Sequence, residues 1–234
     1  MSAPHAPHAA AGFDGPVDAP LRDAVRGLLD AHPDGVLPIV QAGHPVLRQR
    51  AAAYTGQLGD VLDDLLDAMV VTMRAAPGVG LAAPQIGVGL ALAVLEDPGL
   101  PAGHAAAADA RERAPLPLRV LVNPEYEPVG DERVTFYEGC LSVDGYQAAV
   151  ARHRTVRVRG LDGAGATVDE VVTGWPARIV QHETDHLHGT LYVDRAETRS
   201  LCATPTYAAL WADEAVPRRA SDALGFPLEV ADGR

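Results

Sequence analysis

The sequence contains no lysine, so arginine supplies all 19 of its basic residues. They stand against 31 acidic residues, which gives the 234-residue chain a formal net charge of −12. This balance argues against a DNA-binding surface and against adhesion to an anionic membrane. We interpret the missing lysine as a compositional bias rather than as a functional feature.

The chain also lacks long apolar runs, and cysteine is scarce. No stretch approaches the roughly 18 apolar residues that a membrane-spanning helix needs. Residues 1–20 lack both an apolar core and basic residues, so they fit neither a secretory signal nor a transit peptide. The only cysteines, Cys140 and Cys202, cannot form a disulfide framework, and a single bridge is the weaker interpretation for an acidic, enzyme-sized chain. We therefore expect a cytoplasmic protein without a DNA or membrane partner.

What is present is enough apolar sequence, 47% of the residues, for a domain with a sizeable core. We expect residues 1–30 to be a disordered or partly helical extension, with disorder over residues 1–20. Residues 31–195 form the folded domain, and residues 196–234 form a second extension. Residues 97–117 are rich in Ala and Pro and read as an inserted surface loop with His104 exposed in it.

Periodicity predicts the elements of this domain. Apolar residues recur every three or four positions over residues 59–75, with aspartates on the other face, which indicates a helix. A second helix is expected from about Pro176 to His188, and weaker ones near residues 18–31 and 207–214. Strands are expected at residues 89–95, 118–123, 132–137, 156–159, 167–172 and 191–193.

The strongest chemical signal is H-E-x-x-H within residues 181–189. On a helix, His182 and His186 lie about 40° apart on one face and can bind one divalent metal. Glu183 stands beside them and can move protons for a water held there. The motif alone is common, and a solvated helix end with two histidines is the alternative interpretation.

Two further stretches supply what the helix lacks. Cys140 lies in E-G-C-L-S at a strand end, and its thiolate would complete a three-ligand site with one open position, as in catalytic metal sites. The alternative is a buried small hydrophobe. In residues 78–85, G-V-G-L-A-A-P-Q, the glycines permit close approach of a substrate and Gln85 offers an amide donor to an oxyanion. The alternative there is an ordinary turn.

These three stretches, in this order, resemble the motifs of bacterial peptide deformylases, and the resemblance extends from about Pro38 to Arg195. It implies an α+β fold in which mostly antiparallel strands wrap around a central metal-binding helix. It further implies removal of the N-formyl group from N-formylmethionine at the start of nascent polypeptides, with release of formate. The implied reaction is attack of a metal-activated water on the formyl carbon.

The resemblance also implies a role for each site residue. Cys140, His182 and His186 would be the metal ligands, and Glu183 the general base and then the acid. Gln85 and the backbone N–H of Leu141 would stabilise the oxyanion. Substrate would be bound by Val79, Gly80 and Ile179.

The donor set of one thiolate and two imidazoles suits iron(II), zinc, nickel or cobalt, and the resemblance points to iron(II) as the native metal. Such a site should be sensitive to oxidation. The implied partner is a formyl-methionyl peptide. A transient encounter with the ribosome stays open, because residues 196–234 carry about as many acids as arginines. The chain could be a monomer or a homodimer.

The sequence departs from the family at residues 144–147, Asp-Gly-Tyr-Gln, where the family often has proline after Ser142-Val143. This segment should border the methionine pocket, so a hydrolase of another N-acyl peptide, or a drug-tolerant accessory copy, stays an alternative. An ordinary H-E-x-x-H endopeptidase and a non-catalytic metal-binding module are further alternatives. Cys140 argues against the first of these, and intact Glu183 and Gln85 argue against the second. His188 is expected at the surface, and Asp185 either near the ligands or in solvent.

Overall fold

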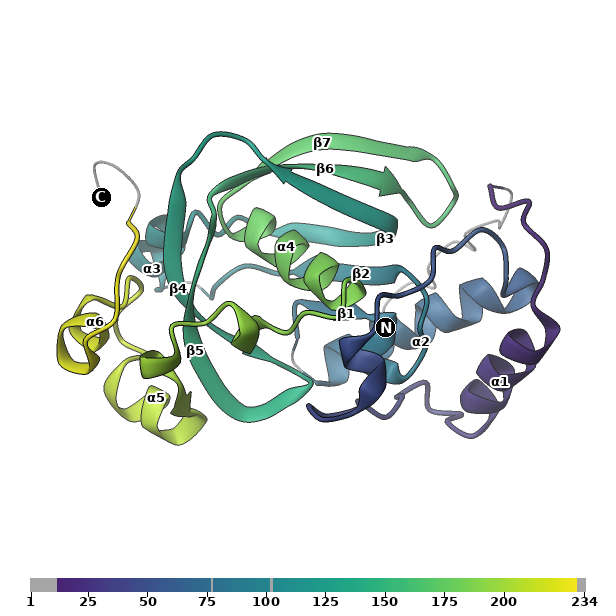
Figure 1. Cartoon of the computed structure of the whole chain (residues 1–234), viewed down its shortest axis with the longest axis horizontal. Coiled ribbons are helices and arrows are strands. Elements are labelled where there is room, and N and C mark those ends of the chain that lie inside the picture. The colour runs from purple at the N-terminus through teal and green to yellow at the C-terminus, as the bar shows by residue number, and fades with distance from the viewer. Residues whose placement is uncertain (1–11, 77, 102, 231–234) are drawn as a thin grey trace.

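The computed structural model describes residues 12–76, 78–101 and 103–230. Two antiparallel sheets lie on different sides of one helix, α4 (Trp175–Leu187), which occupies the centre of the molecule (Figure 1). The expected fold class, antiparallel strands around a central helix, is confirmed. Among the described helices, none has the length and apolar character required to cross a bilayer.

The larger sheet has the order β1-β2-β3-β6-β7, and every neighbouring pair is antiparallel. Its strands are β1 (Gly80–Ala82), β2 (Leu92–Asp97), β3 (Leu116–Pro128), β6 (Thr155–Leu161) and β7 (Thr167–Thr173). The smaller sheet has the order β4-β5-β8, with β4 (Arg133–Cys140), β5 (Val143–His153) and β8 (Cys202–Ala203).

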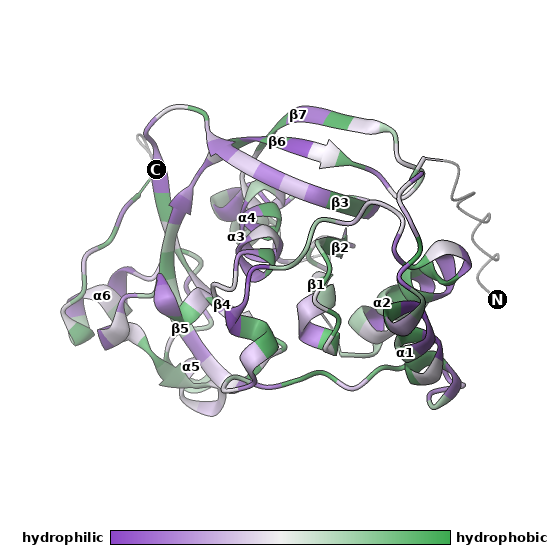
Figure 2. Cartoon of the chain, turned by 45° about the vertical axis from the view of Figure 1, so that its right-hand side comes forward, coloured by the Kyte–Doolittle hydropathy of each residue, from purple (hydrophilic) through white to green (hydrophobic). Residues whose placement is uncertain are grey.

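Helix α2 (Leu62–Ala75) covers one face of the larger sheet, and α4 covers the other. The apolar stripe predicted for residues 59–75 is buried, and it packs on the β1 and β2 residues that face α2. Alternate residues of the same strands face α4, because successive side chains of a strand point to opposite faces. Figure 2 shows the apolar colouring of β1 and β2 between the two helices. The sheet is therefore buried on both faces where it meets the helices.

The predicted amino-terminal helix exists as α1 (Ala19–Asp30), with Asp18 accepting a hydrogen bond from the Leu21 amide at its start. The disorder expected for residues 1–20 concerns in part residues 1–11, which lie outside the described part of the chain. Residues 12–18 pack on the domain instead of remaining disordered: the Phe13 ring meets Tyr54 edge-on at 4.9 Å. The Gly15 amide also donates to the Thr55 carbonyl.

The segment expected to be an inserted surface loop, residues 97–117, contains a short helix, α3 (Ala105–Arg111). The sequence did not predict this helix, because an alanine-rich helix without buried residues shows no apolar stripe. His104 is exposed, as expected. After α3 the chain turns at Glu112, which has a φ of 48°, and the Glu112 carbonyl accepts from the Trp175 amide at the start of α4.

The carboxy-terminal expectations were partly wrong. Residues 191–193 do not form a strand; η4 (Tyr192–Asp194) is a 3₁₀ turn, because the Asp194 carboxylate accepts from the Leu191 amide. The helix expected at residues 207–214 is replaced by α5 (Thr204–Leu210) and α6 (Arg218–Leu224). The remaining 3₁₀ turns are η1 (Pro45–Arg48), η2 (Gly59–Val61), η3 (Ala83–Ile86) and η5 (Thr198–Ser200).

Candidate functional site

Helix α4 is buried on nearly all sides, which is unusual for a helix that carries so many polar residues. It begins after Gly174, whose φ is 72°, and its end is followed by Gly189, whose φ is 73°. A Cβ on Gly189 would lie 2.8 Å from the Arg48 carbonyl, so glycine is required for this close approach. Burial of so many polar side chains is costly unless they find partners inside the protein, and Arg178, Gln181, His182 and Asp185 do find them.

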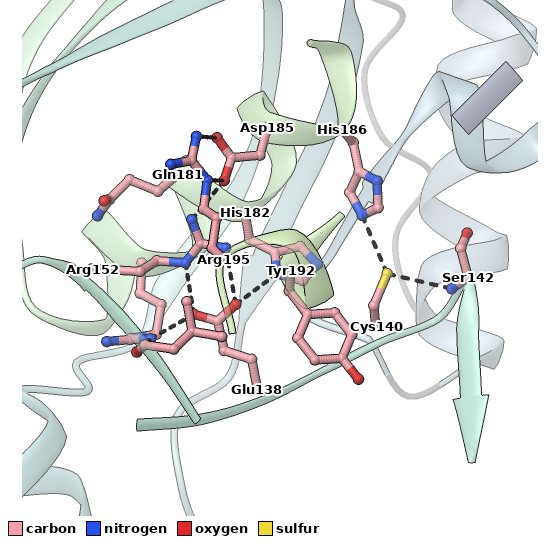
Figure 3. A network of polar contacts seen from close by, with 12 residues as sticks. Glu138, Cys140, Ser142, Arg152, Gln181, His182, Asp185, His186, Tyr192 and Arg195 are labelled. Atoms are coloured by element: carbon pink, nitrogen blue, oxygen red, sulfur yellow. Dashed lines mark hydrogen bonds and ion pairs between the residues drawn. The ribbon is translucent and has the colours of Figure 1, made fainter. Parts of the chain in front are cut away.

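Three potential metal ligands converge where α4 passes the end of β4. The ligand atoms of Cys140, His182 and His186 all lie within 4.8 Å of one another, and the Cys140 Sγ is 3.2 Å from the His186 Nε2 (Figure 3). A tetrahedral cation with two imidazoles and a thiolate separates its ligand atoms by about 3.4–3.6 Å. The described geometry therefore fits one cation with a fourth position left open, and Cys140 and Cys202 are free thiols.

The two histidines differ in their surroundings. Burial lowers the pKa of His186 well below its ordinary range, so its ring is neutral and carries a lone pair for a cation. Burial opposes a charge on His182 too, but hydrogen bonds with Cys140 and Glu138 outweigh it and raise the pKa of His182. Binding of a cation by His182 therefore requires loss of a proton.

Glu138 fixes the orientation of His182. Its Oε2 lies 3.0 Å from the His182 Nδ1, which leaves Nε2 as the nitrogen available to a cation. Burial opposes the Glu138 charge, but Arg152 and Arg178 outweigh it and hold the pKa of this carboxyl well below its usual range. The carboxylate thus stays ionised while it is 6% exposed.

The ion pairs continue from Glu138 to a second carboxylate of α4. Arg152 donates to Glu138 at 2.7 Å and to Asp185 at 2.8 Å, and Asp185 also accepts from the Tyr126 hydroxyl and from Arg195. Asp185 is 1% exposed, so the expectation that it could be solvated was wrong. His188 follows the other expectation: it is partly exposed, contacts Glu125 and lies outside the ligand cluster.

Glu183 differs from the other buried acids because it is not paired with an arginine of the described chain. Its Oε2 has no hydrogen-bond partner among the described residues, and burial raises the pKa of the carboxyl to about 7. The carboxyl lies against Gly80, where a Cβ would come within 2.2 Å of the Glu183 Oε1. Gly80 therefore makes the space in which this carboxyl sits between the ligands and β1.

Gln85 lies on the other side of the cysteine. Its Oε1 accepts from the Ala82 amide at 2.8 Å, which turns its NH₂ group toward the Ser142 Oγ at 3.3 Å and the Cys140 Sγ at 3.6 Å. Leu141 lies in the turn between Cys140 and Ser142, and its carbonyl accepts from Gln41. The amide of Gln85 and the backbone of Leu141 thus flank the sulfur.

The remaining candidate residues lie along β1. The Glu96 amide donates to the Val79 carbonyl on the side of β2, so the N–H and C=O of Gly80 point to the opposite, unpaired edge of this strand. Val79 is half-buried, and it packs against the same cluster as the buried Ile179 of α4. The structure therefore places Val79, Gly80 and Ile179 on the side of β1 that faces α4.

Residues 144–147 begin β5, at the hairpin that follows Leu141 and Ser142. The Asp144 amide donates to Gln41, Tyr146 is 51% exposed, and Tyr146 pairs with Ala203 of β8. The segment that departs from the family pattern is thus held by Gln41 and by β8.

Sequence reasoning missed three residues of the site: Glu138, Arg152 and Tyr192. Glu138 belongs to the E-G-C-L-S stretch, and an acid two residues before a potential metal ligand could have indicated that it orients another ligand. Tyr192 is 1% exposed, and its ring stacks on His182 at 6.2 Å between centroids. Nothing in the sequence pairs Arg152 with Glu138, because that contact depends on the register of β4 and β5.

Comparison with known proteins gives one consistent result. A family model described as polypeptide deformylase matches residues 36–201. Peptide deformylase 1 of Streptomyces coelicolor is 57% identical over 210 residues, which cover 89% of this chain and 94% of the relative. The peptide deformylase of Bifidobacterium adolescentis is 49% identical over 219 residues, covering 93% of this chain and 99% of the relative.

Solved structures agree. The Met-Ala-Ser-bound class I type b peptide deformylase of Acinetobacter baumannii is similar to this chain with a TM-score of 0.61 and 36% identity, covering 68% of this chain and 98% of that structure. The peptide deformylase of Thermotoga maritima has a TM-score of 0.59 at 32% identity, covering 69% of this chain and 98% of that structure. Both alignments leave about a third of this chain outside the shared fold.

We expect the substitution Glu138→Gln to weaken metal binding by about 10- to 100-fold, because the amide no longer fixes the His182 tautomer. The measurement is titration of the metal-free protein with cobalt(II), followed by its absorption spectrum. Glu112→Gln, which alters an ion-paired carboxylate bound to Arg154, is the matched control and should keep the original affinity. Equal affinities for the wild type and Glu138→Gln would remove Glu138 from the positioning role.

A second prediction concerns the unpaired acid in the metal-free protein. The pKa of Glu183 is raised in the folded state to about 7 from its ordinary 4.5, so its neutral form stabilises the fold fully below pH 4.5. That stability is lost as the pH rises through 7. Glu183→Gln should therefore stabilise the metal-free protein at pH 8 by about 2–3 kcal/mol, and by almost nothing at pH 4.5.

Urea unfolding of both proteins in the presence of a chelator measures this difference, and the pH dependence of all other groups cancels in the comparison. A variant less stable than the wild type at pH 8 would show that the Glu183 carboxylate is not under strain from burial.

Proposed function

The chain belongs to the polypeptide deformylase family and removes the N-formyl group from nascent peptides, and we propose that Cys140, His182 and His186 hold the divalent cation for this reaction. The observation that carries the proposal is the convergence of these three ligand atoms within 4.8 Å, beside the unpaired Glu183 carboxyl. Membership of this family accounts for the H-E-x-x-H motif, so the alternative interpretation as an ordinary endopeptidase is dropped.

The native metal is proposed to be iron(II), with zinc, nickel or cobalt able to replace it in purified protein, since imidazole and thiolate ligands suit all four. When bound, such a cation acts as a Lewis acid that polarises a carbonyl group and lowers the pKa of a water molecule from about 15.7 towards 7. The thiolate of Cys140 cancels one of its positive charges, and the two neutral imidazoles cancel none.

Glu183 is proposed as the general base and then the general acid. It lies next to His182 on α4, and the residue is only 4% exposed. Its Oε2 has no partner among the described residues that would favour either the ionised or the neutral form. A carboxyl with a pKa of about 7 can accept a proton near neutral pH and return it. We propose that the Glu183 carboxyl takes the proton of the attacking water and passes it to the leaving amine.

The developing oxyanion is proposed to be stabilised by the Gln85 amide and the Leu141 backbone N–H. The hydrogen bond from the Ala82 amide to the Gln85 Oε1 supports this role, because it fixes the NH₂ group in the donor orientation toward the cysteine side of the site. A donor held in place before the reaction needs no reorganisation when charge develops.

The substrate backbone is proposed to pair with the unpaired edge of β1 at Gly80, with Val79 beside it and Ile179 contacting the methionine side chain. The peptide bound in the related Acinetobacter baumannii structure, Met-Ala-Ser, supports a methionine-initiated peptide as ligand. Because the formyl carbon carries only hydrogen besides its nitrogen and oxygen, it can approach the small space that Gly80 leaves beside Glu183.

We further propose that the enzyme works in the cytoplasm, where nascent formylated peptides arise, and meets the ribosome transiently. It can do so as a monomer or a homodimer. Residues 1–30 and 196–234 are proposed as extensions of a catalytic domain formed by residues 31–195.

Replacing Glu183 by alanine should lower kcat for a formyl-methionyl peptide by orders of magnitude, because the proton acceptor is lost, while bound metal persists. Formate release and metal content of anaerobically purified protein measure the two effects. Glu127→Ala, which removes an exposed carboxylate paired with Arg159, is the control and should keep full turnover. Near-normal turnover of Glu183→Ala would assign the base elsewhere.

Replacing Gln85 by alanine should lower kcat by about 10²–10³-fold, the loss typical of a missing oxyanion donor. The KM for the peptide should change much less, since this hydrogen bond strengthens as charge develops. Gln49→Ala, at an exposed glutamine in the segment after η1, serves as the matched control. A decrease of less than about threefold would exclude Gln85 as an oxyanion donor.

A further inference from the structure

A short segment before η1, residues 39–42, connects the two parts of the chain that carry the proposed oxyanion donors. The Val40 amide donates to the Gln85 carbonyl at 2.9 Å, and the Ala42 amide donates to the Ser142 carbonyl at 2.7 Å. Gln85 belongs to η3, whereas Ser142 lies in the turn between β4 and β5. The segment therefore holds both donor-bearing parts through its backbone.

The side chain of Gln41 adds a third connection to the same turn. Its Nε2 donates to the Leu141 carbonyl at 3.0 Å, and its Oε1 accepts from the Asp144 amide at 3.1 Å. The Nε2 also lies 3.4 Å from the Ile39 carbonyl. A primary amide can donate and accept at once, whereas a carboxylate only accepts and a thioether does neither of these well. Glutamine therefore satisfies both backbone groups, which glutamate and methionine of similar length cannot do.

The turn that Gln41 spans is short. Cys140 pairs with Val143 across it, so Leu141 and Ser142 are its two central residues. The carbonyls of both central residues accept hydrogen bonds from residues 41 and 42. A rotation of the turn would break these hydrogen bonds. The direction of the Leu141 N–H therefore depends on them, because that N–H belongs to the peptide unit directly before the fixed Leu141 carbonyl.

The two proposed oxyanion donors differ in how they are held. The Gln85 side chain is oriented by the Ala82 amide, within its own stretch of chain. The Leu141 N–H is a backbone group, so its orientation follows from the turn and from whatever restrains that turn. Gln41 supplies such a restraint from outside the hairpin of β4 and β5.

We propose that Gln41 is a positioning residue for the reaction, whose side-chain amide fixes the turn so that the Leu141 N–H is directed at the oxyanion. This inference rests on the proposed function. The contacts of the Gln41 side chain are with backbone groups of Ile39, Leu141 and Asp144, so it acts through Leu141. Its effect should appear mainly in kcat, because a hydrogen bond to an oxyanion strengthens as charge develops.

The expected loss is smaller than that for removal of a donor. Gln41 is exposed, so water can replace part of its hydrogen bonding, and the Leu141 N–H itself remains present. We expect Gln41→Met to lower kcat about tenfold, the effect of losing about one ordinary hydrogen bond, against 10²–10³-fold for Gln85→Ala. Gln41→Glu should lower kcat at least as much, since its carboxylate would face the Leu141 carbonyl oxygen.

The experiment measures formate release from a formyl-methionyl peptide by the metal-loaded wild type and both Gln41 variants. The KM should stay within about twofold of the wild-type value. The absorption spectrum of the cobalt(II)-loaded variants should match that of the wild type, because Gln41 contacts the turn and not the ligands. A kcat loss accompanied by a changed cobalt spectrum would refute the proposal, since Gln41 would then act through the metal site.

Gln57 provides the matched control. Its side chain bridges another turn in the same way: its Nε2 donates to the Ala53 carbonyl at 2.8 Å, and its Oε1 accepts from the Thr55 amide at 2.7 Å. Gln57→Met and Gln57→Glu should lower the unfolding temperature by amounts similar to those of the Gln41 variants. They should nevertheless keep kcat within about twofold of the wild-type value, because that turn carries no residue of the site.

The remaining outcomes separate this proposal from the function on which it rests. If the Gln41 variants keep kcat within about twofold of the wild-type value while Gln85→Ala loses 10²-fold or more, the positioning role is refuted and the proposed function stands. An equal kcat loss in the Gln57 variants would also refute the role, because it would reflect a general loss of stability. Absence of formate release from the metal-loaded wild type would instead refute the proposed function itself.

Discussion

The site depends on the buried carboxylate of Glu138, which connects three parts of the chain. It belongs to β4, it receives Arg152 from β5 and Arg178 from α4, and it orients His182 on α4. Removing two or three charges from water is costly unless each finds its partner in good geometry. Here the contacts that offset this cost also fix the distance between β4 and α4. Strand β4 carries Cys140, and α4 carries both histidines.

This arrangement explains why a helix so rich in polar residues can be buried. Asp185 lies in the same network through Arg152, and the Gln181 amide donates to the His153 carbonyl. Of the two acids of α4, Glu183 is the one with a buried oxygen that has no hydrogen-bond partner among the described residues, and its carboxyl rests against the bare Cα of Gly80. The fold thus accepts one uncompensated acid at the position that we propose for proton exchange, whereas the neighbouring Glu138 and Asp185 carboxylates each accept hydrogen bonds from Arg152.

The sequence predicted those features that depend on local pattern. The period of apolar residues in α2 and the spacing of His182 and His186 are properties of a single helix, and the structure confirms both. It could not predict contacts set by strand register: Arg152 lies opposite Val134 in the pairing of β4 with β5, and from there its guanidinium donates to Glu138. Leu191-Tyr192-Val193 looked like a strand, but one hydrogen bond from the Leu191 amide to Asp194 turns it into 3₁₀ structure.

The same distinction applies to glycine and to residues 97–117. The sequence shows that Gly80 permits close approach, but only the fold shows that the Glu183 carboxyl is the group that approaches it. Likewise, residues 97–117 lack periodicity, yet Glu112 at the end of α3 contacts Gly174 at the start of α4, and Arg113 stacks on Trp175 at 5.3 Å. The part of the chain that follows α3 is therefore attached to the amino-terminal end of α4. The helix that carries both histidines therefore also sets the position of this part of the chain, a relation that arises from the fold and not from any local pattern of the sequence.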